Sequence, residues 1–187
     1  HRLGSQADGL FQFTAGALDH RAEVGREYAI RLGLDKDRAY GSWQEMLAGE
    51  KCRDDRIDLV TIATPNSTHF EITKAFLEAG INVLCEKPMT MTVDEGEQIV
   101  RVVNSTGKIC AVNYCYSAYP MVRQARAMVR AGEIGKVRLV VSNFSHGHHG
   151  DAMDADNPRV RWRYDPAMAG ISGQFADCGI YALHMAS

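Results

Sequence analysis

The segment from residue 57 to residue 85 has the pattern of two strands joined by a helix, and no other feature constrains the fold as much. Residues 57–64 form a near-continuous apolar run with many β-branched side chains, which is typical of a parallel strand covered on both faces. Residues 67–79 place apolar side chains at helical spacing, and Gly80 fits the position after a helix end. With a second short strand at 82–85, the pattern predicts a βαβ unit.

The same alternation continues on both sides of this unit. The further elements expected are a strand at 11–18, a helix at 21–32, a helix capped by Ser42, a helix from the Thr92–Glu95 capping box to about Gly107, and a strand at 109–113. Strands that alternate with helices from residue 11 to residue 113 predict an α/β fold with a doubly wound parallel sheet.

A glycine-rich turn after the first strand is missing from this pattern. A nucleotide-binding sheet of this type opens with a strand and a G-x-G-x-x-G turn that holds a pyrophosphate at a helix N-terminus. Gly4 and Gly9 do not fit that spacing, and residues 11–18 already match the second strand. The chain is therefore expected to begin inside the first helix, without the first strand and its glycine loop.

The composition is that of an ordinary globular protein. The 187 residues are 45% hydrophobic and carry a formal net charge of -2, so no basic excess points to nucleic acid as a partner. No apolar run reaches the ~18 residues of a membrane span and no signal peptide is visible, which predicts a cytoplasmic protein without membrane contact. The five cysteines form no C-x-x-C pair and are expected to be reduced, packed thiols.

Glu86 and Lys87 follow directly on the strand at 82–85. In an open α/β sheet, ligands bind at the carboxyl ends of the strands, so a charged pair at this point is expected to face a ligand crevice. The sequence therefore predicts a catalytic site at Lys87, and a surface Glu–Lys pair in a turn is the alternative.

Four segments, one of which contains Glu86 and Lys87, form a pattern that spans most of the chain. They are A-T-P-N-S-T-H at 63–69, C-E-K-P at 85–88, A-G-E-I-G-K-V at 131–137, and Asp177-Cys178-Gly179 followed by His184. Together they resemble the Gfo/Idh/MocA family of NAD(P)-dependent oxidoreductases, which is named after glucose-fructose oxidoreductase and inositol dehydrogenase. The resemblance implies a Rossmann domain at 1–113 and an α+β domain at 114–187. Both domains are expected to be incomplete.

The second domain of this family has an open antiparallel sheet that carries the substrate and often a subunit interface. In this chain, a helix from Pro120 and a first strand at 137–144 are expected to begin that domain. The full-length protein is accordingly expected to be a homo-oligomer.

The resemblance implies that the intact protein transfers a hydride between NAD or NADP and a hydroxyl or carbonyl group of a sugar, inositol or related polyol. The alternative is a non-catalytic regulatory protein of the same fold that binds a nucleotide or a sugar. A third alternative is that this chain binds no ligand by itself, because it lacks the glycine turn that anchors the pyrophosphate. The sequence does not name the substrate.

Lys87 matches the family lysine that takes or relays the proton of the alcohol. A cationic nicotinamide ring and partial burial are both expected to lower the pKa of this lysine towards neutrality. Glu86 matches the family residue that accepts hydrogen bonds from the nicotinamide ribose.

Many family members carry Asp-x-x-x-His, but here Tyr181 stands four residues after Asp177, and the nearest histidine is His184. On a helix these three positions could share one face. Either Tyr181 replaces the usual histidine, with its phenol pKa lowered by Lys87, or His184 takes that role. A core tyrosine and an ordinary helix histidine are the alternatives.

The resemblance also implies a set of cofactor contacts. They comprise Thr64, Pro65, Asn66 and His69 in the loop after the strand at 57–64, together with Asn113, Trp162 and Arg163. The loop is otherwise a helix start capped by Asn66 or Ser67, and Trp162 is otherwise a core anchor. Asp19 after the second strand would favour the ribose of NAD, whereas His20 and Arg21 suit the phosphate of NADP, so both cofactors stay open.

A glycine-flanked loop holds the last candidates, His146, His148, His149 and Asp151. Their spacing is not that of a closed zinc site, so no metal is predicted and a solvated or substrate-facing loop is favoured. Residues 147–158 are the best candidate for a mobile loop over the site.

Overall fold

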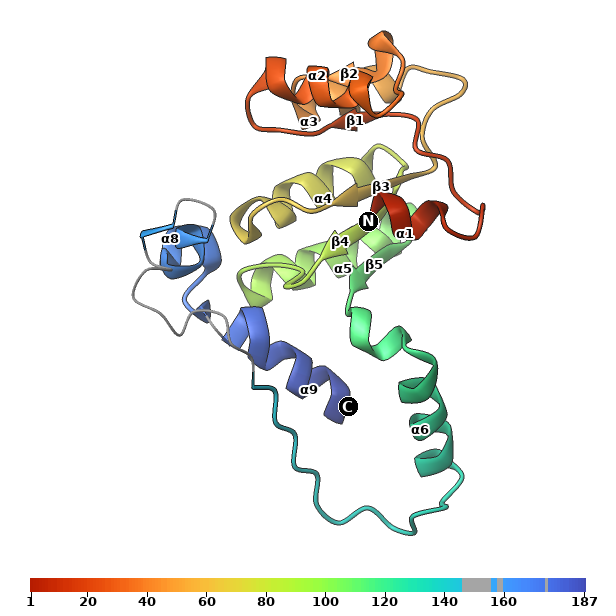
Figure 1. The fold of residues 1–187 in the computed structure, drawn as a ribbon, viewed down its shortest axis with the longest axis vertical. Coiled ribbons are helices and arrows are strands. Elements are labelled where there is room, and N and C mark those ends of the chain that lie inside the picture. The colour runs from red at the N-terminus through yellow and green to blue at the C-terminus, as the bar shows by residue number, and fades with distance from the viewer. Residues whose placement is uncertain (146–155, 158–159, 174) are drawn as a thin grey trace. The chain divides into compact units, whose positions relative to one another are not determined.

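The computed structural model describes residues 1–145, 156–157, 160–173 and 175–187, and the chain forms two compact units (Figure 1). The first unit comprises residues 1–62, 71–84 and 100–110, and the second comprises residues 63–70, 85–99 and 111–187. The division falls near the carboxyl ends of three strands, so the loops that follow those strands belong to the second unit.

Strands and helices alternate up to residue 113, as the sequence predicts, and the structure adds a short strand at Ala39–Tyr40 that was not predicted. The elements are α1 (Arg2–Gln6), β1 (Gly16–Ala17), α2 (Ala22–Arg31), β2 (Ala39–Tyr40), α3 (Trp43–Glu50), β3 (Leu59–Ile62), α4 (His69–Glu78), β4 (Asn82–Glu86), α5 (Val93–Thr106) and β5 (Cys110–Asn113). Helices α4 and α5 link β3 to β4 and β4 to β5, which is the kind of crossover that parallel strands require.

The strands form two sheets where a single sheet was expected. β1 pairs with β2 in parallel, with Gly16 opposite Ala39, and β3, β4 and β5 form a second sheet in that order. In the Rossmann order 3-2-1-4-5-6, the first strand lies between the second and the fourth. The described residues before β1 contain the helix α1 and no strand. The sheet is therefore divided at the position of the strand that the sequence pattern lacks.

Strand β1 is much shorter than the predicted strand at 11–18. It covers only Gly16–Ala17, and its partner β2 is equally short. Since a strand extends only as far as a neighbour pairs with it, the two-residue partner limits its length. β3 is likewise shorter than the apolar run at 57–64.

Apolar side chains of α4 and β4 form much of the core of the first unit. Phe76 and Leu77 of α4, Ile81 after it and Val83 of β4 are almost completely buried. Gly80 ends α4 with a φ of 79°, a left-handed conformation that favours glycine. The predicted apolar face and helix end are thereby confirmed.

A capping box starts α5, as predicted. The hydroxyl oxygen of Thr92 accepts a hydrogen bond from the Glu95 N–H at 3.2 Å, and Glu95 Oε2 accepts from the N–H groups of Thr92 at 3.2 Å and Met91 at 2.9 Å. These bonds satisfy N–H groups that a helix start would leave without partners.

Replacing Thr92 by alanine is expected to lower the free energy of unfolding by about 1 kcal/mol, because it removes the acceptor for the Glu95 N–H. Denaturant unfolding of the full-length protein measures the change. Val93→Ala at the neighbouring exposed position is the control and should cost less than about 0.5 kcal/mol. Equal effects of the two substitutions would contradict a capping role for Thr92.

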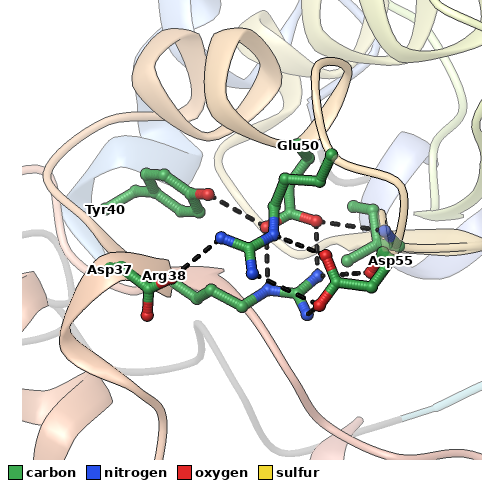
Figure 2. Close-up of polar contacts among 7 residues, drawn as sticks. Asp37, Arg38, Tyr40, Glu50 and Asp55 are labelled. Carbon is green, nitrogen blue, oxygen red and sulfur yellow. Dashed lines mark hydrogen bonds and ion pairs between the residues drawn. The ribbon is translucent and has the colours of Figure 1, made fainter.

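Arg38 and Glu50 form a buried ion pair in the first unit (Figure 2). Glu50 Oε2 accepts hydrogen bonds from Arg38 Nη2 at 2.5 Å and from the Ile57 N–H at 3.0 Å. Glu50 Oε1 accepts from Arg38 Nε at 3.0 Å and from the Tyr40 hydroxyl at 2.9 Å. Asp55 lies on the outer side, 3.4 Å from Arg38 Nη1. The network joins α3 to β2 and to the segment before β3.

Burial and the hydrogen bond to Glu50 raise the pKa of Tyr40 to about 12. The unfolded chain loses this proton near the ordinary tyrosine pKa of about 10, so the folded state binds more protons above that pH. Stability is therefore expected to be complete below about pH 10 and to fall as the pH rises towards 12. Unfolding measured against pH should show a shallower alkaline decline in Tyr40→Phe than in the wild type. The exposed Tyr28→Phe is the control, and a decline in Tyr40→Phe as steep as in the wild type would contradict the assignment.

The second unit continues from β5 with short turns and helices. They are a 3-10 turn at Cys115–Ala118, α6 (Pro120–Arg130), a 3-10 turn at Arg161–Tyr164, α8 (Pro166–Ala169), a π-helical turn at Phe175–Gly179 and α9 (Ile180–Ala186). The predicted helix from Pro120 is confirmed as α6, with proline in its first turn.

No strand forms at 137–144, where the sequence predicts the start of a second sheet. A strand needs a hydrogen-bonded neighbour, and in the part of the chain that the structure describes no segment pairs with these residues. The antiparallel sheet of the second domain is therefore not seen.

All five cysteines are free thiols. Cys85 is buried in β4, but Cys52 is exposed, so the prediction of packed thiols is wrong for Cys52. Within the described ranges, no helix combines the length and the apolar character needed to cross a membrane.

Candidate active site

Lys87 lies directly after β4, and its side chain is held by Asp177. The Lys87 ammonium donates to Asp177 Oδ1 at 2.6 Å and to the Asp177 main-chain oxygen at 2.5 Å. The side chain of Lys87 is only 11% exposed. Two residues 90 positions apart in the sequence, both predicted as catalytic, are thus brought together.

Asp177 also contacts a second cation. Its Oδ2 lies 3.4 Å from Arg163 Nε, and the Arg163 guanidinium stacks over the Trp162 ring at 4.5 Å. One carboxylate therefore bridges the lysine and the arginine. Arg163 and Trp162, predicted near the cofactor or substrate, lie beside the catalytic candidates.

Tyr181 also lies near Lys87, which contacts the face of its ring. Lys87 Nζ is 4.9 Å from the ring centroid, within the range of a cation–π interaction. The ring packs edge-on against Tyr116 and tilted against Phe144, with centroids 4.7 Å and 5.2 Å away.

Burial raises the pKa of the Tyr181 phenol, and the neighbouring Cys115 raises it further. The prediction that Lys87 lowers this pKa is therefore wrong. The lysine contacts the face of the ring, while burial disfavours the phenolate. Tyr181 is accordingly protonated at neutral pH and can donate a hydrogen bond.

His184 takes a different position from Asp177 and Tyr181. Its ring stacks on Tyr114, with centroids 4.1 Å apart and planes at 20°. The three positions could share one face of a regular helix, but in the structure Asp177 lies in the π-helical turn Phe175–Gly179, whereas Tyr181 and His184 lie in α9.

Glu86 has both carboxylate oxygens engaged at the end of β4. Oε1 accepts a hydrogen bond from Asn113 Nδ2 at 2.7 Å, and Oε2 accepts from the Lys87 N–H at 3.1 Å. Asn113, predicted as a cofactor contact, ends β5 and holds the carboxylate. Two neighbouring strands thus fix the orientation of Glu86 beside Lys87.

The loop after β3 is tied down by its own side chains. The Thr68 hydroxyl donates to Thr64 Oγ1 at 2.6 Å, and Asn66, only 7% exposed, donates to the Ala169 main-chain oxygen at 3.2 Å. Pro65 stands at the cap position of the 3-10 turn Asn66–Thr68, and no side chain caps that turn. The predicted capping by Asn66 or Ser67 is therefore wrong, because Asn66 instead pairs with a residue 103 positions away.

Asp19 and Arg21 belong to the first unit and pair with each other. Asp19 Oδ1 accepts from the Arg21 N–H at 2.8 Å and from Arg21 Nε at 3.1 Å. These hydrogen bonds lower the pKa of Asp19 to about 2. Asp19, which suits NAD, and Arg21, which suits NADP, thus form an ion pair with each other, so this pair favours neither cofactor.

His146, His148, His149, Asp151 and nearly all of the predicted mobile loop at 147–158 lie outside the described residues. Elsewhere in the described chain, no group of three or more potential ligands is placed to hold a metal ion.

Sequence reasoning missed the aromatic and thiol side chains around Tyr181. Cys115 and Tyr116 lie in the 3-10 turn shortly after β5, and Phe144 comes from the segment where a strand was predicted. The rule that ligands meet the carboxyl ends of strands could have singled out Cys115 and Tyr116, since it had already singled out Lys87 after β4. No sequence signal marks Phe144.

Two family models match this chain. The model described as an oxidoreductase family with an NAD-binding Rossmann fold matches residues 5–114, and the GFO/IDH/MocA C-terminal domain matches residues 122–187. Among curated proteins, the chain is 43% identical to the uncharacterized oxidoreductase YfiI of Bacillus subtilis, over 99% of this chain and 48% of that protein. It is 34% identical to D-xylose 1-dehydrogenase (NADP(+)) 2 of Haloferax volcanii, over 92% of this chain and 48% of that protein.

Solved structures agree with these matches. An inositol dehydrogenase homolog of Azotobacter vinelandii, complexed with NADH and myo-inositol, superposes with a TM-score of 0.90 at 36% identity, covering 100% of this chain and 47% of that one. The chain thus spans about half the length of the relatives it matches. The resemblance drawn from the sequence is confirmed: the chain belongs to the Gfo/Idh/MocA family of oxidoreductases, and its amino-terminal part has the α/β Rossmann fold of that family.

Proposed function

We propose that the intact protein is an NAD(P)-dependent dehydrogenase that oxidises a CH–OH group of a sugar, inositol or related polyol, or reduces the corresponding carbonyl. The Lys87–Asp177 pair carries this proposal. It places an amine and a carboxylate 2.6 Å apart at the carboxyl end of a Rossmann strand, where ligands of such sheets bind.

The chemistry assigned to this pair is movement of the alcohol proton. A proton can pass from Lys87 Nζ to Asp177 Oδ1, which leaves the amine free to take the proton of the substrate hydroxyl. Arg163 contacts the other oxygen of Asp177 and thereby helps to orient the carboxylate beside Lys87. In the reverse direction, Lys87 returns the proton to the carbonyl oxygen as it is reduced.

The residues present fit the nicotinamide half of NAD or NADP. Glu86 is oriented by Asn113 and by the Lys87 N–H, so its carboxylate can accept hydrogen bonds from ribose hydroxyls at the end of β4. When bound, the cofactor supplies the acceptor or donor of the hydride. Thr64 and Pro65 after β3 are proposed to line the same cofactor, with Asp19 and Arg21 at the adenosine end.

The names of relatives support the substrate class. One relative is a D-xylose 1-dehydrogenase using NADP(+), and one solved homolog holds NADH and myo-inositol. We further propose a division into a cofactor domain at 1–113 and a substrate domain starting at 114, with an antiparallel sheet in the complete second domain that also serves homo-oligomer assembly.

A second candidate is a regulatory protein of the same fold that binds a nucleotide or a sugar without turnover. Tyr181 favours it, because Tyr181 occupies the position of the usual family histidine and its raised pKa keeps it from acting as a base near neutral pH.

Calorimetry of NAD+ and NADP+ binding to the full-length protein, followed by a panel of sugars and polyols monitored for reduced nicotinamide, tests both candidates. The dehydrogenase is expected to bind one of the two cofactors and to reduce it with a member of the panel. Tight binding without turnover across the panel would favour the regulatory protein. Failure to bind either nucleotide would overturn the dehydrogenase and also the nucleotide-binding form of the regulatory protein.

Tyr181→Phe is expected to change kcat by less than about threefold. Any fall of kcat at alkaline pH in the wild type is expected to persist in this variant. Phenylalanine keeps the ring that contacts Lys87, and burial already keeps the phenol protonated in the wild type. Tyr181→Ala removes the ring and is expected to lower kcat further. If the fall of kcat at alkaline pH disappeared in Tyr181→Phe, the Tyr181 phenol would instead be the group whose titration causes it.

A further inference from the structure

The loop that carries Lys87 is held at three points in the second unit. At its start, the Lys87 N–H donates to Glu86 Oε2 at 3.1 Å. At its end, the N–H groups of Met91 and Thr92 donate to Glu95 Oε2. Between these points, the main-chain oxygen of Pro88 lies 2.7 Å from His69 Nδ1. The contact to His69 comes from outside this loop and holds the main chain of the residue directly after Lys87.

His69 is the first residue of α4 and is only 1% exposed. Its second ring nitrogen, Nε2, lies 2.8 Å from the Thr64 main-chain oxygen. The imidazole thus stands between two main-chain carbonyls, one in the loop after β3 and one in the loop after β4. Both loops carry residues of the candidate active site.

These contacts leave no ring atom of His69 available to a ligand. Both nitrogens already face carbonyl oxygens, and the ring is closed off from solvent. A carbonyl oxygen only accepts, so each of the two contacts is a hydrogen bond only when its ring nitrogen carries a proton, and the contact to Pro88 needs the proton on Nδ1. Direct contact of His69 with the cofactor, as the resemblance implies, would require breaking one of these contacts.

We propose that His69 is a positioning residue: its Nδ1–H holds the Pro88 carbonyl and thereby keeps Lys87 Nζ at Asp177, and the ring does not contact the cofactor. This inference rests on the proposed dehydrogenase function. It predicts that changes at His69 lower turnover through Lys87 and leave cofactor binding almost intact.

Two amide substitutions separate the roles of the two nitrogens in the full-length protein. Asparagine places an N–H close to the position of Nδ1, whereas glutamine places one close to Nε2. His69→Asn is therefore expected to keep kcat within about tenfold of the wild type, and His69→Gln to lower it by about 100-fold, the scale of a 1 Å misplacement of a reacting group. The Kd for the cofactor should change by less than about threefold in both variants.

Ile72→Val, a buried position in the same helix, is the control for general softening of α4 and should leave kcat unchanged. Equal losses of kcat in His69→Asn and His69→Gln would overturn the proposal, as would a rise in cofactor Kd that matches the loss of turnover. If the wild type binds cofactor but turns over no substrate, the dehydrogenase proposal fails instead. The wild-type spectrum described next still tests the contact in that case.

NMR of the wild-type protein selectively labelled with nitrogen-15 histidine tests the hydrogen bond without any variant. The expected signal is a ring N–H on Nδ1 of His69 that exchanges slowly with solvent, assigned by its nuclear Overhauser contacts to neighbouring protons. A His69 ring with no proton on Nδ1 would overturn the proposal, whatever the stability of the variants.

Discussion

Replacing Lys87 by methionine in the full-length protein is expected to lower kcat by about three orders of magnitude while leaving the cofactor Kd close to its wild-type value. Methionine keeps most of the length and apolar volume of the side chain but removes the amine that Asp177 holds at 2.6 Å. Asp177 retains Arg163 as a partner, so its carboxylate is not left without a cation. The loss should therefore come from proton transfer and not from collapse of the site.

Steady-state turnover and calorimetry of the cofactor, measured on the same preparation, provide the test. Lys74→Met is the matched control, because Lys74 is more exposed and pairs with Glu78 one helical turn away. Its kcat should equal that of the wild type. If Lys87→Met kept the wild-type kcat, Lys87 would have no role in proton transfer. If turnover and cofactor binding were lost together, Lys87 would be a cofactor-binding residue.

Replacing Glu50 by alanine is expected to lower the free energy of unfolding by about 3–5 kcal/mol. Glu50 is completely buried, and its carboxylate receives hydrogen bonds from Arg38, Tyr40 and the Ile57 N–H. Among the described residues, its removal leaves the nearly buried Arg38 guanidinium with the outlying Asp55 as its one carboxylate partner. An uncompensated buried charge and a buried N–H without its acceptor both favour the unfolded chain.

Denaturant unfolding of the full-length protein measures this change, with Glu78→Ala on the surface of α4 as a control expected to stay within about 0.5 kcal/mol. The double variant Arg38→Met/Glu50→Leu removes both charges together and should recover much of the loss. A single-variant effect no larger than that of the control would show that the pair contributes little to stability.

Local sequence chemistry was sufficient to predict most of the secondary structure. The Thr92–Glu95 capping box, the apolar face of α4 and the proline at the start of α6 each depend on neighbours within a few positions, and the structure confirms them. The position of Lys87 at a strand end followed from the same local pattern and a general rule on ligand crevices.

Features that depend on distant partners could not be predicted in this way. Asn66 pairs with a main-chain atom 103 positions away, and no local pattern distinguishes that role from a helix cap. Asp177 lies in a π-helical turn and not in the regular helix that holds Tyr181 and His184, and burial among Tyr116 and Phe144 raised a Tyr181 pKa that was expected to fall. A strand at 137–144 depended on a neighbouring strand that the described residues do not supply.

The bond from Asn66 to Ala169 ends on a main-chain oxygen, and this makes the two positions unequal in the substitutions they tolerate. Every residue type carries that oxygen, so exchange of Ala169 for serine or glycine leaves the acceptor in place. Asn66 has few substitutes, because a side chain of the same length with an N–H donor is needed. The hydrogen bond therefore depends on the residue type at position 66 and not on the residue type at position 169.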